Sequence, residues 1–394
     1  MIRDLDLVVF GATGFTGGLT AEHLARHAPA GLRWALAGRN AEKLAAVRDR
    51  LAAIRPDLGD LELLHADVTD PGSLADVAGR AKVVVTTVGP YLTHGEPLVA
   101  ACAEAGTDYV DLTGEPEFID RMYLAHHATA VRTGARIVHA CGFDSVPHDL
   151  GVLFAVQQLQ ADGPLRVRGV VRASATFSGG TFHSAVTAAS RARQMKEAAA
   201  QRRRVEPRPQ GRSSRAVAGR PHRDPLLGMW LLPLPTVDPL VVARSGAALA
   251  AYGPDFRYSH YAGTRTLRYA VGGAAGVGAL AAAAQVPPLR RQLLQRVQQG
   301  EGPDEQRRAR SWFTVDVVAE TGPGGDGDGR ALHARVSGGD PGYDETARML
   351  GESALCLLLD DNPPTAGSVT TAQAMGENLT ARLRSGGMRF EVVG

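Results

Sequence analysis

The amino-acid sequence predicts an α/β protein, a Rossmann-type doubly wound parallel sheet followed by a second, mixed α/β domain. Three observations carry this prediction. Up to residue 140, apolar runs too short for helices alternate with amphipathic segments of helical length, which is typical of parallel strands covered on both faces. The first apolar run ends in a glycine-rich turn that leads straight into a helical pattern. With 394 residues, the chain also exceeds one typical domain.

The first predicted strand spans residues 5–10, and the glycine-rich turn separates it from the helical pattern at 19–24. Gly11 would allow the tight turn, Gly14 would let backbone N–H groups approach a pyrophosphate, and Gly17 would let helix and strand pack closely. Such a turn can also simply join a strand to a helix, but the strand before it and the helix after it favour a dinucleotide site. The candidate cofactor-binding residues here are Gly11, Thr13, Gly14, Phe15, Thr16 and Gly17.

A second predicted strand, residues 34–38, ends where a dinucleotide fold places the group that reads the adenosine ribose. No acidic residue stands at that position. Arg39, Asn40 and Lys43 stand there instead, and cations suit a 2′-phosphate better than a free 2′-hydroxyl. We therefore expect NADPH/NADP rather than NADH as the cofactor, although Arg39 could also be a solvated residue at a strand end.

The alternation continues with strands expected at 61–67, 82–88, 108–112 and 136–140, and helices at 41–53, 70–78, 97–105 and 117–133. In a doubly wound sheet, the ligand lies beyond the carboxyl ends of the strands. Asp67 and Val68 would therefore flank the adenine. The turn that contains Gly89, Pro90 and Tyr91 would approach the nicotinamide.

The second half of the chain is less regular. Strands are expected at 165–176, 312–319 and 331–336, and helices at 182–200, 343–359 and 372–383. The turn at 177–181 resembles the first glycine turn and either binds an anion or simply starts a helix, whereas 321–329 is too rich in glycine to be ordered with confidence. We place an NADP-binding domain at 1–147 and a substrate or interaction domain at 148–342, with the helices of 343–394 packing back onto the first domain.

Composition excludes several classes of function. The formal charge of +2 is too close to zero for general nucleic-acid binding, and no Cys/His cluster has zinc spacing, so we expect neither a nucleic-acid partner nor a metal. The three cysteines, Cys102, Cys141 and Cys356, stand in apolar surroundings and are expected to be reduced and buried. The chain begins without the pattern of a signal peptide, so we expect a cytoplasmic protein. Its oligomeric state stays open.

Residues 201–215 are cationic and contain prolines, which predicts a flexible surface loop. The segment is either a solvated linker or a docking site for an acidic partner, such as an acyl carrier protein or another phosphate-bearing carrier.

Residues 269–288 carry no charge and reach the length of a membrane span. Glycine and alanine dominate the segment, so insertion across a bilayer would gain little free energy. We expect a helix that is buried, lies at a membrane surface or lines an apolar substrate groove. Peripheral contact with a membrane therefore remains open.

Several sequence blocks are shared with a known family. The chain resembles the saccharopine dehydrogenase-like NADP-binding oxidoreductases, specifically the bacterial branch described as trans-acting enoyl reductases. The blocks follow one another through most of the chain: 11–17, Gly38-Arg39, 88–91, 109–115, 141–147, 178–181 and 339–343. The chain departs from many relatives at His148, where they have serine. The resemblance implies an NADPH-binding domain, a mixed second domain and roles in lipid or polyketide biosynthesis.

The absence of a tyrosine–lysine pair disfavours one route of carbonyl reduction. Short-chain dehydrogenases activate a carbonyl with a tyrosine four residues before a lysine, and no tyrosine here has that partner. Reduction of an enoyl thioester needs donors that stabilise the developing enolate and an acid that protonates the α carbon. Tyr91 is the donor best placed by sequence, and Asp144 and Ser145 could orient the substrate or relay a proton. His139 and His148 are weaker candidates.

Three functions stay open from the sequence. The leading hypothesis is an NADPH-dependent enoyl reductase that acts in trans on a carrier-bound or long-chain lipid or polyketide thioester. The second is an imine reductase or amine dehydrogenase for an amino-acid-like substrate, which would need a carboxylate-binding arginine pair such as Arg168 and Arg172. The third is a non-catalytic NADPH-binding protein associated with lipid.

Overall fold

The computed structural model describes residues 3–175, 179–296, 302–322 and 329–393. Its first sheet has seven parallel strands in the order β14-β6-β5-β4-β1-β2-β3. Their bounds are β1 Leu5–Phe10, β2 Trp34–Gly38, β3 Glu62–His65, β4 Ala81–Thr86, β5 Asp108–Asp111, β6 Arg136–Val138 and β14 Gly367–Val369. From β1 the chain adds β2 and β3 on one side of the sheet and then continues with β4 on the other side. The carboxyl ends of β1 and β4 therefore border a crevice, which is where a doubly wound sheet binds its ligand.

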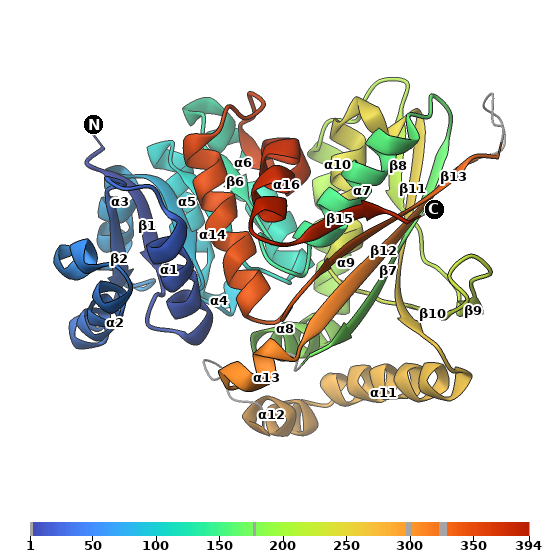
Figure 1. The fold of residues 1–394 in the computed structure, drawn as a ribbon, viewed down its shortest axis with the longest axis horizontal. Helices are drawn as coiled ribbons and strands as arrows, with labels where there is room; N and C mark the ends of the chain where they lie inside the picture. Colours follow the sequence, from blue (N-terminus) through green and yellow to red (C-terminus); the bar gives the residue numbers. More distant parts are fainter. Residues whose placement is uncertain (1–2, 176–178, 297–301, 323–328, 394) are drawn as a thin grey trace.

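Helices cover both faces of this sheet (Figure 1). They are α1 Phe15–His27, α2 Ala41–Ile54, α3 Pro71–Arg80, α4 Tyr91–His94, α5 Glu96–Ala105 and α6 Pro116–Thr133, with a short 3₁₀ turn η1 at Pro56–Asp60. Alternate side chains of β1 enter two different cores, Leu7 and Val9 on one face and Val8 and Phe10 on the other. The continuous apolar runs of the sequence are therefore strands that are buried on both sides.

The second sheet is mixed and has the order β15-β13-β12-β7-β11-β10-β9, with β8 paired to β11. Its strands are β7 Leu165–Ser174, β8 Ser213–Ala216, β9 His222–Arg223, β10 Trp230–Pro233, β11 Asp255–Thr264, β12 Trp312–Thr321, β13 Ala331–Gly338 and β15 Arg389–Val392. A parallel sheet and a second mixed sheet confirm the predicted fold class. The sequence did not predict β8, β9, β10, β11, β14 or β15. Strands of two to four residues carry no readable alternation, and the ten-residue β11 was missed as well.

The remaining helices join or flank the two sheets. They are α7 Val146–Leu159, α8 Gly179–Ser190, α9 Ala192–Val205, α10 Asp238–Ala248, α11 Leu267–Gln285, α12 Pro287–Arg296, α13 Glu305–Ala309, α14 Asp344–Leu359, α15 Thr371–Ala374 and α16 Gly376–Ser385, with η2 at Ala250–Tyr252. The C-terminal segment contributes to both halves: α14 packs on α1, β14 extends the first sheet and β15 extends the second. The predicted turn residues Phe177 and Ser178, and residues 323–328 of the glycine-rich loop, lie outside the described residues.

The expectation of a flexible loop over all of 201–215 is wrong, because only residues 206–212 lie between a helix and a strand. Helix α9 continues to Val205, and β8 begins at Ser213. Arg202 is 5% exposed and donates to the carboxylates of Asp120 and Glu206, and Arg212 donates to the main-chain carbonyl of Gly246. The basic composition predicted a solvated segment because composition does not reveal buried acids elsewhere in the chain that neutralise an arginine.

The glycine turn is held by a close approach between two backbones. A Cβ atom on Gly17 would lie 2.2 Å from the carbonyl oxygen of Gly11, and Gly11 itself has a φ of +95°. At position 17 only glycine fits without displacing backbone. At position 11 the positive φ strongly favours glycine. The geometry explains why this turn has glycine where α1 meets β1.

We expect Gly17→Ala to destabilise the protein by about 1–3 kcal/mol, because the new methyl group overlaps backbone that cannot move aside. Gly18→Ala is the matched control on the same helix. Its Cβ atom would lie 3.3 Å from the flexible end of Arg50, so we expect little loss or a small gain in stability. Thermal and urea unfolding of both variants measure the difference, and equal stability of the two would contradict the packing argument.

Candidate functional site

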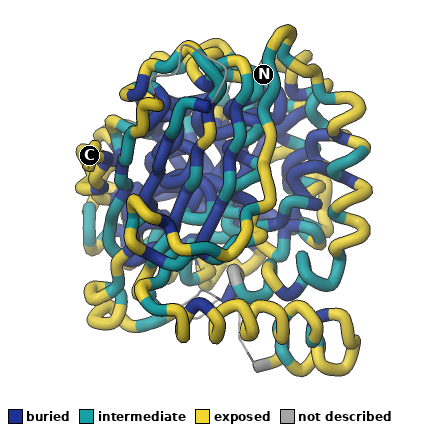
Figure 2. The backbone as a smooth tube through the Cα atoms, turned by 90° about the vertical axis from the view of Figure 1, so that its right-hand side faces the viewer, coloured by how far each residue is buried: buried dark blue, intermediate teal, exposed yellow. Residues whose placement is uncertain are grey.

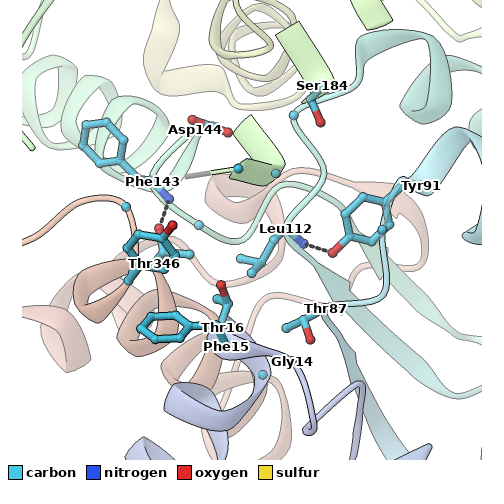
Figure 3. A pocket seen from close by; sticks show the side chains of 18 of the residues that line it. Gly14, Phe15, Thr16, Thr87, Tyr91, Leu112, Phe143, Asp144, Ser184 and Thr346 are labelled. Atoms are coloured by element: carbon cyan, nitrogen blue, oxygen red, sulfur yellow. Dashed lines mark hydrogen bonds between the residues drawn. The ribbon is translucent and has the colours of Figure 1, made fainter. Parts of the chain in front are cut away.

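A cavity of about 470 Å³ lies between the glycine turn, the carboxyl ends of β4, β5 and β6, and the start of α8 (Figure 3). Its walls come from segments far apart in the sequence. Lining residues are contributed by 11–17, 87–91, 112–115, 140–144, 173–175, 179–184 and 341–346. The first sheet supplies one side and elements of the second half supply the other. The cavity therefore lies where a doubly wound fold places its ligand.

The glycine turn provides a cradle for an anion. Thr13, Gly14, Phe15, Thr16 and Gly17 all line the cavity. Helix α1 begins at Phe15, and within the described residues no side chain caps its first turn and no acidic residue stands in it. A Cβ atom on Gly14 would contact nothing closer than the carbonyl oxygen of Gly11 at 3.5 Å, so the backbone is open to a close approach. The backbone N–H groups in the first turn of α1 and the positive end of the helix fit the pyrophosphate of a dinucleotide.

The predicted adenosine-side residues lie at the carboxyl ends of β2 and β3, outside the lining of the cavity. Asn40 caps α2, since its side chain accepts the N–H of Lys43 at 2.8 Å. Asp67 accepts the N–H and the hydroxyl of Thr69, each at 2.8 Å, and these bonds hold the pKa of its carboxyl below the usual range. The side chains of Arg39 and Lys43 are exposed, as a site for a phosphate at the edge of the sheet requires. Val68 packs against the core beside β3.

Tyr91 forms part of the wall beside Gly89 and Pro90, but its hydroxyl is engaged with the main chain. It donates to the carbonyl of Thr86 at 3.2 Å. It also accepts the N–H of Leu112 at 3.2 Å, the bond drawn in Figure 3. Burial and the nearby charge of Asp111 raise the pKa of Tyr91 well above its usual value. Tyr91 would have to leave its bond to Thr86 before donating a proton to a substrate.

Asp144 lines the cavity at the carboxyl end of the β6 segment, and its Oδ2 lies 3.0 Å from the point where a Cβ atom on Gly114 would stand. Burial, followed by the charge of Asp238, raises the pKa of Asp144 to about 6. An acid with this pKa can hold and release a proton near neutral pH. Ser145 is fully buried, does not line the cavity, and its hydroxyl has no hydrogen-bond partner within the described residues.

Two polar cavity residues that contact each other, Glu115 and Ser184, were missed from the sequence. Glu115 accepts the N–H groups of Tyr91 at 3.2 Å and Leu92 at 2.9 Å, and the hydroxyl of Ser184 at 3.3 Å. Burial raises the pKa of Glu115. Its position directly after β5 is a signal that the rule of carboxyl strand ends could have used. Ser184 comes from α8 in the second half, and no local pattern predicted that this hydroxyl would meet Glu115.

The buried carboxyl of Asp111 links several segments that lie next to the cavity. It accepts the hydroxyl of Tyr109 at 2.9 Å and the N–H groups of Thr113 at 3.0 Å and Ala140 at 2.9 Å. His139 Nδ1 lies 2.7 Å from its Oδ2. The bond to Ala140 supports a non-glycine residue at a φ of +61°. His139 therefore faces Asp111 rather than the cavity.

His148 takes part in a buried cluster behind the site. Its Nδ1 lies 2.7 Å from Asp238 Oδ1, and His260 Nε2 lies 3.6 Å from Asp238 Oδ2. The three side chains could offer metal-binding atoms within 4.8 Å of one another, but the close His148–Asp238 contact is the spacing of an ion pair. Burial lowers the pKa of His260 to about 4. None of the three lines the cavity.

The arginine pair required by an amino-acid substrate is engaged elsewhere. Arg168 contacts Asp224 at 2.7 Å and Glu320 at 2.8 Å, and Arg172 contacts Asp316 at 3.6 Å. Neither arginine lines the cavity. The buried cysteines, in contrast, are as expected: all three are free, and burial raises the pKa of each thiol.

Comparison with known proteins identifies the relatives of this chain. The model of the saccharopine dehydrogenase NADP-binding domain matches residues 7–138. A Mycobacterium tuberculosis protein provisionally named a trans-acting enoyl reductase is 39% identical over 99% of this chain and 97% of its own length. The trans-acting enoyl reductase of Mycobacterium ulcerans is 37% identical over 98% and 97%. The apo structure of saccharopine dehydrogenase (L-Glu forming) from Saccharomyces cerevisiae superposes with a TM-score of 0.58 at 12% identity, covering 99% of this chain and all of that one.

The raised pKa of Asp144 predicts a pH-dependent effect on stability. The folded state keeps a proton that the unfolded chain releases between pH 3.8 and about 6, so the ionised carboxyl destabilises the fold above that window and not below it. We expect Asp144→Asn to raise the free energy of unfolding at about pH 8 by up to about 3 kcal/mol, and by little at about pH 4.

Asp67→Asn is the control of opposite sign, because the pKa of Asp67 is lowered and its ionised form stabilises the fold at neutral pH. Urea unfolding at both pH values measures both variants. A gain for Asp144→Asn that is the same at the two pH values would show that the effect comes from packing rather than from the carboxyl's ionisation.

Proposed function

The chain belongs to the saccharopine dehydrogenase-like NADP-binding oxidoreductases, and from that premise we propose that it is an NADPH-dependent enoyl reductase acting in trans on a carrier-bound or long-chain lipid or polyketide thioester. The observation that carries the proposal is one cavity with an open helix N-terminus on one side and a carboxyl of pKa about 6 on the other. Such a cavity can hold a dinucleotide and a proton donor around one substrate.

The residues that would hold the cofactor lie along the carboxyl edge of the first sheet. The backbone around Gly14 and Thr16 would bind the pyrophosphate at the start of α1. The exposed cations Arg39 and Lys43 would pair with a 2′-phosphate, which is the reason to propose NADPH over NADH. Gly89 and Pro90 would form the wall against the nicotinamide. When bound, NADPH supplies the hydride that adds to the β carbon of the enoyl group.

The chain's own residues then have to donate one proton and to stabilise one developing negative charge. As the hydride adds, electron density moves to the thioester oxygen, and the α carbon takes up a proton to complete the reduction. Asp144, protonated below its pKa of about 6, is the proposed donor of that proton. The hydroxyl of Ser184 donates to Glu115 in this structure. With substrate bound, it is the proposed hydrogen-bond donor to the thioester oxygen.

The carrier of the acyl group belongs to the same proposal. Arg203 and Arg204 are exposed in the last turn of α9 and Arg208 is exposed just after it, and we propose that they meet an acidic carrier protein or phosphate-bearing arm. Arg202 is excluded from that role, because Asp120 and Glu206 already neutralise it inside the fold.

The decisive experiment is oxidation of NADPH with a panel of enoyl thioesters, with the saturated product identified by mass spectrometry. We expect turnover whose kcat falls as pH rises through about 6, because Asp144 loses the proton that it donates. Asp144→Asn should lower kcat by roughly 10²-fold or more and remove this pH dependence. NADPH binding should be retained, which separates loss of chemistry from loss of the cofactor site.

Tyr91→Phe compares the two candidate donors. Because the Tyr91 hydroxyl is already bonded to Thr86, we expect a much smaller loss of kcat than for Asp144→Asn. The reverse ranking would make Tyr91 the proton donor. No saturated product from any thioester, despite tight NADPH binding, would overturn the proposed reaction.

Coenzyme preference tests the adenosine side separately. We expect Arg39→Ala to weaken NADPH binding by about tenfold or more and to leave NADH binding unchanged, since only NADPH carries the phosphate that the guanidinium would meet. Arg26→Ala, at an exposed arginine in the last turn of α1, is the matched control and should change neither. An Arg39→Ala variant with wild-type preference, measured by fluorescence titration of both coenzymes, would exclude Arg39 from the site.

A further inference from the structure

The feature that the proposed function does not use is the long helix α11. It is long and apolar enough to cross a membrane by length and composition, yet only 11% of its most apolar stretch is buried in the protein. Figure 1 shows α11 and α12 lying along the outside of the molecule, below the second sheet, and Figure 2 shows the turns along this edge as exposed. The expectation that 269–288 could be a buried helix is therefore wrong.

One narrow side of α11 faces the protein and is made of small residues. Ala270 and Ala284 are buried, and a Cβ atom on Gly273 would lie 3.6 Å from the side chain of Leu232 in β10. At the far end, Gln285 donates to the carbonyl of Ala189 in α8. Both halves of the helix are thus attached to the body, which fits a helix lying along a surface better than one that leaves the protein to span a bilayer.

The outward side of α11 is apolar. Its large side chains are largely exposed: Tyr269 by 64%, Val271 by 61% and Val277 by 48%, with Leu267 at 51% at the first turn. Between them stand alanine and glycine residues that are also exposed. Arg268 is the single charged residue in the helix. A soluble protein rarely leaves so long an apolar surface in contact with water, so this surface is expected to be covered.

The charges around the helix identify what covers it. Arg265 and Arg268 are exposed at its start, and Arg291 is exposed in α12 beyond its end. The sequence from Phe256 to Gly300 contains no acidic residue, and neither does α8, on which both α11 and α12 pack. The acids that follow in the sequence are Glu301, Asp304 and Glu305, of which the last two stand at the start of the short helix α13. An apolar strip with arginines at both ends is complementary to a bilayer that has anionic headgroups.

We propose that α11 and α12 form a docking element that lies on the surface of an anionic lipid bilayer. The element also has a direct relation to the cavity: α8 contacts both helices and contributes Gly179, Gly180 and Ser184 to the cavity lining. Docking through α11 places one helix between the lipid and the site. The acyl chain of a lipid thioester, the substrate class of the proposed function, would then reach the cavity along α8 from the membrane side.

The test is flotation of the purified full-length protein with vesicles of phosphatidylcholine alone or mixed with phosphatidylglycerol. We expect the protein to float with the anionic vesicles and to be released as salt is raised, because arginine–headgroup attraction is screened. Val271→Glu combined with Val277→Glu should weaken binding roughly tenfold or more, since charge replaces the apolar surface. Val131→Glu is the matched control: this valine is 50% exposed on α6, on the other side of the molecule in Figure 1, and the variant should bind like wild type.

A second measurement reports the site of contact without relying on loss of binding. Cys102, Cys141 and Cys356 are buried, so an environment-sensitive dye can be attached to a single cysteine introduced by Val277→Cys. Its fluorescence should rise with anionic vesicles, whereas the same dye at Val131→Cys should not change. Protection of the Val277→Cys dye from a reductant added outside the vesicles would show a spanning helix and overturn the surface geometry.

Two results would overturn the proposal itself. Flotation of the Val271→Glu/Val277→Glu variant equal to wild type would show that α11 does not bind the lipid. Failure of the wild type to float, together with a dimer by light scattering that the double variant dissociates, would assign the surface to a second copy of the chain. The vesicle assays contain neither NADPH nor thioester, so their outcome is independent of the proposed reaction.

Discussion

The candidate site depends on one buried carboxylate, Asp111. Its Oδ1 accepts N–H groups from the turn after β5 and from the segment that follows β6, and its Oδ2 lies 2.7 Å from His139 Nδ1. A fully buried carboxylate is tolerable only when such donors surround it. The two segments that Asp111 joins carry Glu115 and Asp144 into the cavity. The relative position of Glu115 and Asp144 therefore depends on Asp111, a residue outside the cavity lining.

Burial gives neighbouring carboxyls different roles. Glu115 is surrounded by N–H donors of Tyr91 and Leu92, so it orders the wall of the cavity. Asp144 lies near a second negative charge, that of Asp238, and both burial and this charge raise its pKa. The buried cluster of His148, Asp238 and His260 thus acts on the cavity through the charge of Asp238, without lining it. An acid that keeps its proton near neutral pH requires such an arrangement of unfavourable neighbours.

Helix α8 connects the chemistry to the outside of the molecule. One side of it completes the cavity through Ser184, and another packs against α11, whose outer surface is apolar and exposed. The two halves of the chain therefore meet at the cavity, whereas the contact between α8 and α11 lies within the second half. A membrane-docked orientation would bring an insoluble acyl chain to the site without exposing the chain to water.

The sequence by itself determined the doubly wound sheet and the glycine turn, because the alternation of short apolar runs and the spacing of Gly11, Gly14 and Gly17 are local patterns. It also identified Asp144 as a candidate, since strand ends can be read locally. Tertiary structure decided what no local pattern contains: that Arg202 is buried against Asp120, that Ser184 meets Glu115, and that α11 stays exposed. Burial, ion pairing and pKa are set by neighbours distant in the chain, and only the folded arrangement brings those neighbours into contact.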